Sequence, residues 1–336
     1  MEVNRKALLA VLEAVQPGLN LDGSIEQSDC FVFNDGHVLT FDDELACCMS
    51  TEVDFTGAVK AKPLLELLQK LPEEVLLIDA AENELRVKGQ KRKAAIKMEA
   101  EIKLPLDQIP MPDDLAWRKL PSDFCEAVEV VRQCASKDDS TFALTCIHLA
   151  PDFIESCDNY QASRYLIKTG FEQDVLIRNR AALHLANMSA TEVAEQEGWV
   201  HFRNANGLTL SSRQYKEEYP QLEEVIDING QRTTLPEGME AACDLARVFT
   251  KDNADNDQIA LLVDKNQLTV RGEGVGGWYK ESKTIKYSGP ELHFRITPAM
   301  LKNVLARSRE CFVASNRLWI DAGKFVYVAM LFAEEE

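Results

Sequence analysis

Two helical patterns recur along this 336-residue chain, each of them three times and at a nearly constant interval. Apolar residues at helical spacing predict a first helix at residues 4–13, 121–137 and 236–251, and a second at 60–70, 178–188 and 297–309. Two short strand patterns around a polar turn follow each second helix, and the turn with Asn206-Gly207 is typical of a hairpin. A period this regular indicates three copies of one unit of about 112 residues.

Each predicted unit runs helix, strands, helix, strands, which favours an α+β fold. Two amphipathic helices packed on one face of an antiparallel sheet bury the apolar sides of both layers. Loop-like sequence at residues 110–113 and 227–234 predicts the boundaries between the units. We therefore expect three domains, at residues 1–113, 114–230 and 231–336, a division that also suits a chain too long for one hydrophobic core.

The composition is typical of a soluble globular protein, with 46% apolar and 27% charged residues. No apolar run reaches the roughly 18 residues that a membrane-spanning helix needs, and the first residues lack the apolar core of a signal peptide. The nine cysteines include no Cys-x-x-Cys pair and most lie among apolar residues, so we expect reduced, buried thiols rather than disulfides. These features predict a cytoplasmic protein.

Motifs that carry enzyme chemistry are missing from the sequence. Residues 272–277 match the glycine pattern of dinucleotide-binding loops, but that pattern must open a helix, and here the strand-like residues 283–287 follow. We expect a hairpin loop instead. The five histidines show no metal-ligand spacing, and no Gly-x-Ser-x-Gly nucleophile motif occurs. The sequence predicts no catalytic residue, no metal site and no cofactor, and therefore a protein that is not an enzyme.

The chain is strongly acidic, with a net charge of −18, but its cations are unevenly placed. The three second helices together carry eight basic residues against one acidic residue, whereas the three first helices carry six against seven. Such a surplus on equivalent elements predicts a surface that faces a polyanion. The alternative is that these cations simply suit helix ends and solvent. The eight basic residues are Lys60, Lys62, Lys70, Arg178, Arg180, Lys302, Arg307 and Arg309.

Several short motifs occur in the order and at the spacing of one known family. Residues 157–162, Cys-Asp-Asn-Tyr-Gln-Ala, stand in the place of that family's Thr-Asp-Gly-His-Arg-Leu, and residues 208–213 followed by 218–220 resemble its Ser-Arg…Phe-Pro-Asp-Tyr segment. In the third unit, residues 266–268, 287–289 and 327–330 also match. With these motifs and its three repeats, the whole chain resembles the bacterial sliding clamp, the beta subunit of DNA polymerase III.

The resemblance implies a head-to-tail homodimer whose domains form a ring around double-stranded DNA, with the helices lining the hole. The eight cations would then face phosphates without reading sequence, as expected for a chain with no helix-turn-helix or zinc-finger signature. The ring would tether a DNA polymerase, would be placed on DNA by a clamp loader, and would be cytoplasmic and nucleoid-associated. The alternatives are a clamp-fold scaffold that binds proteins without encircling DNA, and an acidic mimic of DNA.

The resemblance also implies two protein-binding surfaces. The dimer interface would join Lys91, Lys93, Ala94 and Ile96 to Phe249 and Tyr287. A partner-peptide pocket between the second and third domains would use Leu144, Cys157, Asn159, Tyr160, Gln161, Ala162, Pro220, Val225, Val328 and Met330. Residues 159–162 depart from the family pattern, with Asn for Gly, Tyr for His, Gln for Arg and Ala for Leu, and Glu224 stands where a basic residue is common. The peptide preference therefore stays open, and the alternative is that these residues serve interdomain packing.

Overall fold

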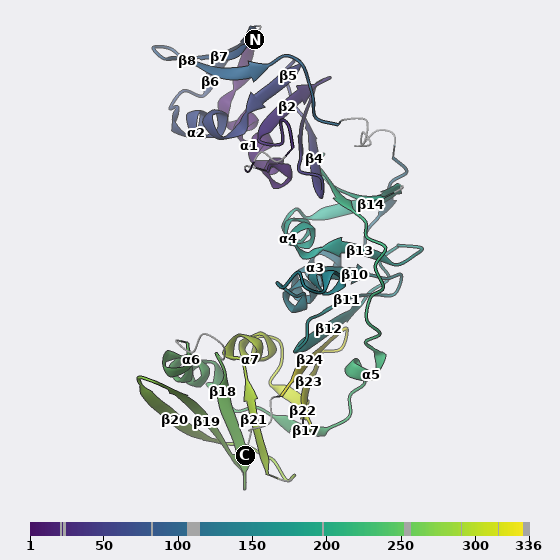
Figure 1. Cartoon of the computed structure of the whole chain (residues 1–336), viewed down its shortest axis with the longest axis vertical. Coiled ribbons are helices and arrows are strands. Elements are labelled where there is room, and N and C mark those ends of the chain that lie inside the picture. The colour runs from purple at the N-terminus through teal and green to yellow at the C-terminus, as the bar shows by residue number, and fades with distance from the viewer. Residues whose placement is uncertain are drawn as a thin grey trace. The chain divides into compact units, whose positions relative to one another are not determined.

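The computed structural model describes residues 1–20, 22, 25–81, 83–105, 115–196, 198–251, 257–289, 291–314 and 316–331 (Figure 1). They form two compact units, which we call unit 1 (Met1–Glu129 with Thr169–Lys216) and unit 2 (Val130–Lys168 with Glu217–Glu336). The predicted boundary at residues 110–113 lies outside the described residues. The division into three domains at residues 113 and 230 therefore stays a prediction.

Unit 1 is built on one antiparallel sheet, which has 12 strands among the described residues, in the order β1-β6-β7-β8-β5-β2-β3-β4-β16-β15-β14-β9. Adjacent strands such as β3 and β4 form hairpins, whereas β4 and β16 are far apart in sequence and pair directly. The strands are β1 (Glu2–Asn4), β2 (Cys30–Asn34), β3 (His37–Phe41), β4 (Leu45–Ser50), β5 (Gly57–Lys60), β6 (Val75–Ala81), β7 (Glu84–Lys88), β8 (Lys93–Glu99), β9 (Arg118–Lys119), β14 (Ala190–Gln196), β15 (Trp199–Asn204) and β16 (Thr209–Arg213), and a further strand, β13 (Val175–Arg178), also belongs to unit 1.

The helices of unit 1 bury one apolar stripe each. In α1 (Arg5–Ala14) the buried residues are Leu8 and Leu12, and in α2 (Ala61–Lys70) they include Leu64 and Leu68. Residues four apart lie on one face of a helix, so each stripe packs inward while the opposite face stays polar. Asn4 fixes the start of α1, because its side-chain oxygen accepts the backbone N–H groups of residues 6 and 7 at 3.0 and 3.1 Å. Helix α4 (Asn179–Asn187) also belongs to unit 1. Helix α3 (Phe124–Val131) begins in unit 1 and ends in unit 2.

Unit 2 contains two antiparallel strand arrays. The first runs β10-β11-β12-β24-β23-β22-β17, and the second runs β20-β19-β18-β21. Helices α6 (Met239–Thr250) and α7 (Pro298–Leu305) contact each other, and α6 also lies against β18, β19 and β20. The strands are β10 (Cys146–Leu149), β11 (Phe153–Cys157), β12 (Gln161–Leu166), β17 (Gln231–Thr234), β18 (Ile259–Asp264), β19 (Gln267–Gly274), β20 (Gly277–Thr284), β21 (Leu292–Ile296), β22 (Glu310–Val313), β23 (Arg317–Asp321) and β24 (Phe325–Met330).

The glycine-rich residues 272–277 form a hairpin, as the sequence predicted. Gly274 of β19 pairs with Gly277 of β20, and no helix follows. Gly272 is needed for packing, because a Cβ atom there would lie 2.1 Å from the carbonyl oxygen of Ala246 on α6. The α+β architecture is confirmed, with helices packed on antiparallel strands.

Some predicted elements are shorter in the structure. The helix predicted at residues 121–137 is α3 plus a 3₁₀ turn, Arg132–Cys134. Helix α7 ends at Leu305, so Arg307 and Arg309 follow the helix instead of lying on it. The short helix α5 (Glu223–Ile226) was not among the predicted elements. Within the described residues, no helix has both the length and the apolar character needed to cross a membrane.

Candidate functional site

A groove of about 360 Å³ lies in unit 2, beside the junction of β12 with β24. Its wall combines the turn between β11 and β12, the end of β24, the chain leading into α5, and the first residue of β23. Most of the side chains are apolar, as is usual for a ligand-binding groove. The lining residues are Leu144, Cys157, Asp158, Asn159, Gln161, Ala162, Pro220, Gln221, Leu222, Val225, Arg317, Val328 and Met330.

Nine of the ten residues predicted for a partner-peptide pocket line this groove. The exception is Tyr160, which lies on the turn with 49% of its surface exposed. Sequence reasoning missed four lining residues, Asp158, Gln221, Leu222 and Arg317. Three of them lie within two residues of a predicted residue, whereas Arg317 reaches the groove only because β23 pairs with β24, which sets Arg317 opposite Met330.

The turn between β11 and β12 is held by Asp158. One carboxylate oxygen accepts the backbone N–H groups of Tyr160 and Gln161 at 2.7 and 2.8 Å, and the other accepts the side-chain amide of Gln161 at 3.1 Å. The carbonyl oxygen of that amide in turn accepts the hydroxyl of Tyr327 on β24 at 2.8 Å. Burial raises the pKa of Tyr327 well above its ordinary value, so this hydroxyl stays a donor.

A buried tyrosine fixes the other wall. The backbone N–H of Cys157 donates to the hydroxyl oxygen of Tyr219 at 3.0 Å, which positions the neighbouring Pro220 at the groove. Burial raises the pKa of Tyr219 well above its ordinary value and that of the Cys157 thiol to about 11. Both groups are therefore neutral at physiological pH, and the groove offers no thiolate.

A buried charge cluster lies under the same wall. Glu155 is only 2% exposed, and its carboxylate contacts His148 Nδ1 at 2.8 Å and accepts Arg164 Nε at 2.7 Å. Arg164 also pairs with Glu223 of α5 at 3.0 Å and lies over the ring of Phe153. The guanidinium thus joins β12 to α5, and each buried charge has a partner, as burial requires.

Two side chains of β23 hold α5 in place. Arg317 donates through one terminal nitrogen to the carbonyl oxygen of Glu224 at 3.1 Å, and Trp319 donates through Nε1 to the carbonyl oxygen of Val225 at 3.0 Å. The Nε–H of Arg317 is buried and has no hydrogen-bond partner within the described part of the chain.

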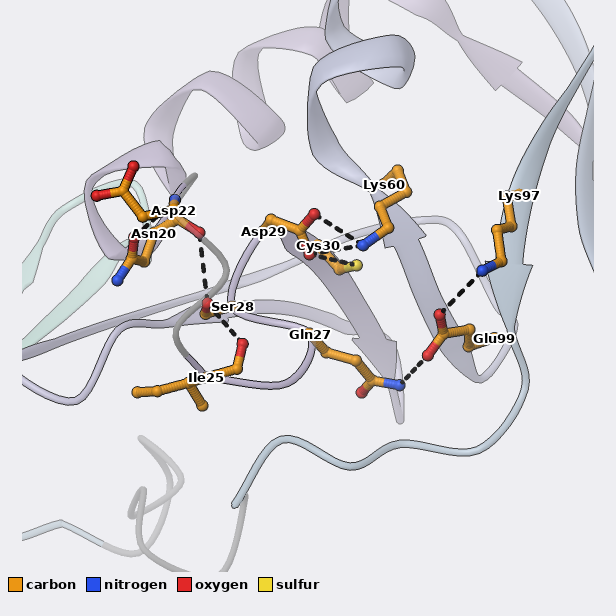
Figure 2. A network of polar contacts seen from close by, with 10 residues as sticks. All are labelled: Asn20, Asp22, Ile25, Gln27, Ser28, Asp29, Cys30, Lys60, Lys97 and Glu99. Carbon is orange, nitrogen blue, oxygen red and sulfur yellow. Dashed lines mark hydrogen bonds and ion pairs between the residues drawn. The ribbon is translucent and has the colours of Figure 1, made fainter.

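The cations predicted to face DNA are mostly engaged by carboxylates of the chain itself. Figure 2 shows Lys60, whose ammonium donates to both oxygens of Asp29 at 2.8 and 2.7 Å. These hydrogen bonds raise the pKa of Lys60 above its ordinary value. Burial raises the pKa of Asp29, but the hydrogen bonds from Lys60 and Cys30 outweigh it and leave that pKa below its ordinary value.

The same network anchors a neighbouring loop. Gln27 donates through its amide to Glu99 at 3.0 Å, and Glu99 also pairs with Lys97 (Figure 2). The amide of Gln27 further donates to the carbonyl oxygen of Glu101 and accepts the backbone N–H of Lys103. Asp29 and Lys60 therefore belong to a structured polar network.

The other predicted cations follow this pattern. Pairs form between Lys70 and Glu66, Arg178 and Glu44, Arg180 and Asp42, Lys302 and Asp244, and Arg309 and Glu237. Arg307 lies over the ring of Phe325 at 4.9 Å, and Lys62 is exposed. Six of the eight cations thus have a carboxylate partner. Most of these carboxylates lie outside the second helices, so a charge count over those helices alone leaves them out.

The residues predicted for a dimer interface occupy two kinds of position. On β8, Lys93 to Lys97 pair with β7 on one side, while pairing with β5 begins only at Met98, so the other side of residues 93–97 has no strand partner among the described residues. Lys91 and Lys93 are exposed and Ala94 is half-buried, but Ile96 is buried.

The predicted interface residues of unit 2 are less exposed than three neighbours that the sequence did not single out. Phe249 is half-buried on α6 and Tyr287 is buried. Large apolar side chains are exposed nearby in sequence: Leu245 and Val248 of α6 are 50% and 53% exposed, and Trp278 of β20 is 64% exposed. No simple sequence signal separates Leu245 and Val248 from the buried side of α6, because they fall next to its apolar stripe.

The elements occur three times in the order helix, strands, helix, strands, and the β4–β16 and β12–β24 junctions pair strands that are distant in sequence. This arrangement is the fold of the sliding clamps. Comparison with solved structures confirms this fold. The DNA polymerase sliding clamp from Bacillus subtilis matches with a TM-score of 0.85 at 14% sequence identity, over 99% of both chains. The DNA polymerase III subunit beta from Pseudomonas aeruginosa matches with a TM-score of 0.83 at 14% identity, and the beta subunit from Thermotoga maritima with 0.82 at 15%, again over 99% of both chains. No protein-family model and no curated protein sequence matches the chain.

Proposed function

We propose that this chain is a DNA sliding clamp, which forms a head-to-tail homodimeric ring around duplex DNA and tethers a DNA polymerase to it. The observation that carries the proposal is the likeness of fold to DNA polymerase III beta subunits over 99% of both chains. The ring has no catalytic role, works in the cytoplasm with the nucleoid, and is placed on DNA by a clamp loader. Its partners attach through the groove in unit 2, where apolar anchors of a short peptide fit between β24 and α5.

DNA contact in this proposal is weak and independent of sequence. Lys62 and Arg307 have no carboxylate partner in the described part of the chain, so they are available to phosphates directly. The six paired cations must exchange a carboxylate for a phosphate, which reduces their net contribution to DNA affinity. A ring that is retained by encirclement does not need tight contacts, and loose phosphate contacts allow sliding.

The unpaired side of β8 and the exposed apolar residues of α6 supply the dimer interface in this proposal. A backbone edge with open N–H and C=O groups is completed by a strand from a second copy. Leu245 and Val248 provide apolar area beside that contact.

Topological retention gives the test. The protein is placed on nicked circular plasmid DNA by a clamp loader, the complex is isolated by gel filtration, and the plasmid is then cut once. We expect the protein to stay with circles, to leave linear DNA within minutes, and to be retained when both DNA ends are blocked by streptavidin on biotinylated bases. Retention on unblocked linear DNA would contradict encirclement, and a monomeric mass in solution would contradict the dimer.

The pairing of six cations favours one alternative function, a clamp-fold scaffold that binds proteins without encircling DNA. The double substitution Lys62→Glu with Arg307→Glu separates the two, with Arg232→Glu as a control on an exposed cation of unit 2. A clamp should lose DNA retention with the double variant and keep it with the control. A scaffold should bind its peptides equally well in all three forms and show no retention in any.

A further inference from the structure

We propose that Arg317 makes the groove of unit 2 selective for peptides that carry an acidic side chain next to their apolar anchors. This inference rests on the proposed function of the groove as a peptide site. It concerns which peptides the groove accepts, and it arises from one lining residue that lies outside the motif resembling the sliding-clamp pocket.

The charge of the groove is set by two residues. Among the described lining residues, Arg317 is the one basic side chain and Asp158 is the one acidic side chain. The remaining lining is apolar or carries amides, with Leu144, Val225 and Val328 among the apolar members. A peptide that places apolar side chains against this wall therefore meets one cation and one anion.

The two charges differ in how much of their bonding capacity is already used. Asp158 accepts three hydrogen bonds from its own turn, two from backbone N–H groups and one from the amide of Gln161. Arg317 carries five N–H donors, of which one bonds the carbonyl oxygen of Glu224, and its buried Nε–H is unsatisfied within the described residues. The hydrogen-bonding capacity that the groove leaves unused therefore belongs to a cationic donor, the guanidinium of Arg317.

A carboxylate matches that donor. The fork of a guanidinium binds two carboxylate oxygens in parallel, and it does so more strongly where water is excluded. No carboxylate pairs with Arg317 among the described residues, since the nearby Glu223 is paired with Arg164 and Glu224 contributes its backbone carbonyl while its side chain is exposed. An acidic side chain of the bound peptide would pair with the terminal N–H groups of Arg317 that Glu224 leaves unused, whereas a basic one would meet Arg317 as a like charge.

Fluorescence polarisation with defined peptides tests the proposal. The probe is a fluorescein-labelled octapeptide with a Glu directly before two Leu residues and an amidated C-terminus, and its match carries Gln in place of Glu. We expect the dimeric wild-type protein to bind the Glu peptide about tenfold more tightly than the Gln peptide. The substitution Arg317→Gln should remove this preference, so that the variant binds both peptides equally, whereas Arg232→Gln, at an exposed arginine of unit 2, should change neither value.

Two additional arms separate the explanations. Arg317→Lys keeps the charge without the fork and should retain part of the preference. A Gln peptide with a free C-terminal carboxylate reports whether any nearby carboxylate suffices, and we expect it to bind like the amidated Gln peptide. Tighter binding of this peptide than of the Glu peptide would overturn the assignment to a side chain.

The remaining outcomes distinguish the inference from the function on which it rests. If wild-type protein binds the Glu and Gln peptides equally, or if Arg317→Gln weakens both by the same factor, Arg317 has a structural role in holding α5 and the inference is wrong while the groove remains a peptide site. If neither peptide binds, the peptide site itself fails and the inference fails with it.

Discussion

Two places join distant strands, β4 with β16 in unit 1 and β12 with β24 in unit 2. They share their turn hydrogen bonds and strand pairing but differ in side-chain chemistry. In unit 1 the carboxylate of Asp42 accepts the N–H groups of Glu44 and Leu45, and in unit 2 that of Asp158 accepts those of Tyr160 and Gln161. The strand that follows each turn then pairs antiparallel with the last strand of another repeat.

The register of the two junctions gives position-by-position equivalents. Leu45 lies three residues after Asp42 and pairs with Ser212. Gln161 lies three residues after Asp158 and pairs with Ala329, so Ser212 corresponds to Ala329. Arg213 therefore corresponds to Met330. The next hydrogen bond agrees, because the N–H of Arg213 donates to Glu44 O at 2.9 Å and that of Met330 to Tyr160 O at 2.7 Å.

The side chains at these equivalent positions decide what each junction can do. In unit 1, Arg213 donates to both the backbone and the carboxylate of Asp43 and lies over the ring of Trp199. In unit 2, Asn159 stands in the place of Asp43 and Met330 in the place of Arg213, and both line the groove. The same scaffold is thus closed by ion pairs in one unit and offers apolar surface in the other, so the groove is a property of side chains and not of the fold.

The largest effect is expected at a buried charge that only one junction has. Glu155 occupies the position of Leu39 in unit 1, and Glu155→Leu would leave Arg164 with Glu223 as its one carboxylate among the described residues. We expect the free energy of unfolding to fall by about 3 kcal/mol, measured by urea denaturation. The control Leu39→Met conserves volume and should cost less than about 1.5 kcal/mol. A loss below about 1 kcal/mol for Glu155→Leu would show that Glu223 alone compensates Arg164.

An arginine at position 330 of unit 2, as at the equivalent position 213 of unit 1, should weaken peptide binding to the groove. Met330→Arg places a cation at the end of β24, and we expect the affinity for the Gln octapeptide to fall about 30-fold, since an apolar contact is lost and a charge meets apolar anchors. Met330→Leu should keep affinity within about threefold. Circular dichroism confirms that both variants fold, and unchanged affinity for Met330→Arg would show that Met330 does not contact the peptide.

The junctions should also respond differently to acid. His201 of unit 1 is buried, and burial lowers its pKa to about 4, below the ordinary value of 6.5. The unfolded chain then takes up the proton more readily, so stability present above pH 6.5 is lost as the pH falls toward 4, by about 2 kcal/mol at pH 5. The equivalent of His201 in unit 2 is Trp319, which does not titrate. His201→Gln should flatten the dependence of unfolding free energy on pH between 7 and 5, and an unchanged slope would assign it to other groups.

The reciprocal change in unit 1 should have the smallest effect. Arg213→Met removes a partly exposed ion pair and a stacking contact with Trp199. Such contacts contribute about 1 kcal/mol together, so we expect a comparable loss of unfolding free energy. The variant should not gain affinity for the octapeptides, because Asp43 and Glu44 remain; measurable binding would show that the arginine alone excludes ligands there.

The sequence predicts the parts of this molecule that depend on local pattern. The repeat period, the α+β class and the hairpin at residues 272–277 follow from periodicity and turn chemistry. Most groove residues were found because they cluster in short motifs. Arg317 was not, since its place depends on the register of β23 with β24. Likewise, Asp29 and Lys60 are 31 residues apart, and their pairing requires the sheet that brings them together.

The junction strands join repeats through their backbones, so the sequences of these strands can diverge widely. The N–H and C=O groups that link β16 to β4 and β24 to β12 are supplied by every residue type except proline, which lacks the donor. Substitution along these strands therefore leaves the attachment between repeats intact as long as the inward face stays apolar. A chain assembled in this way can share only 14% of its residues with another and still trace the same path.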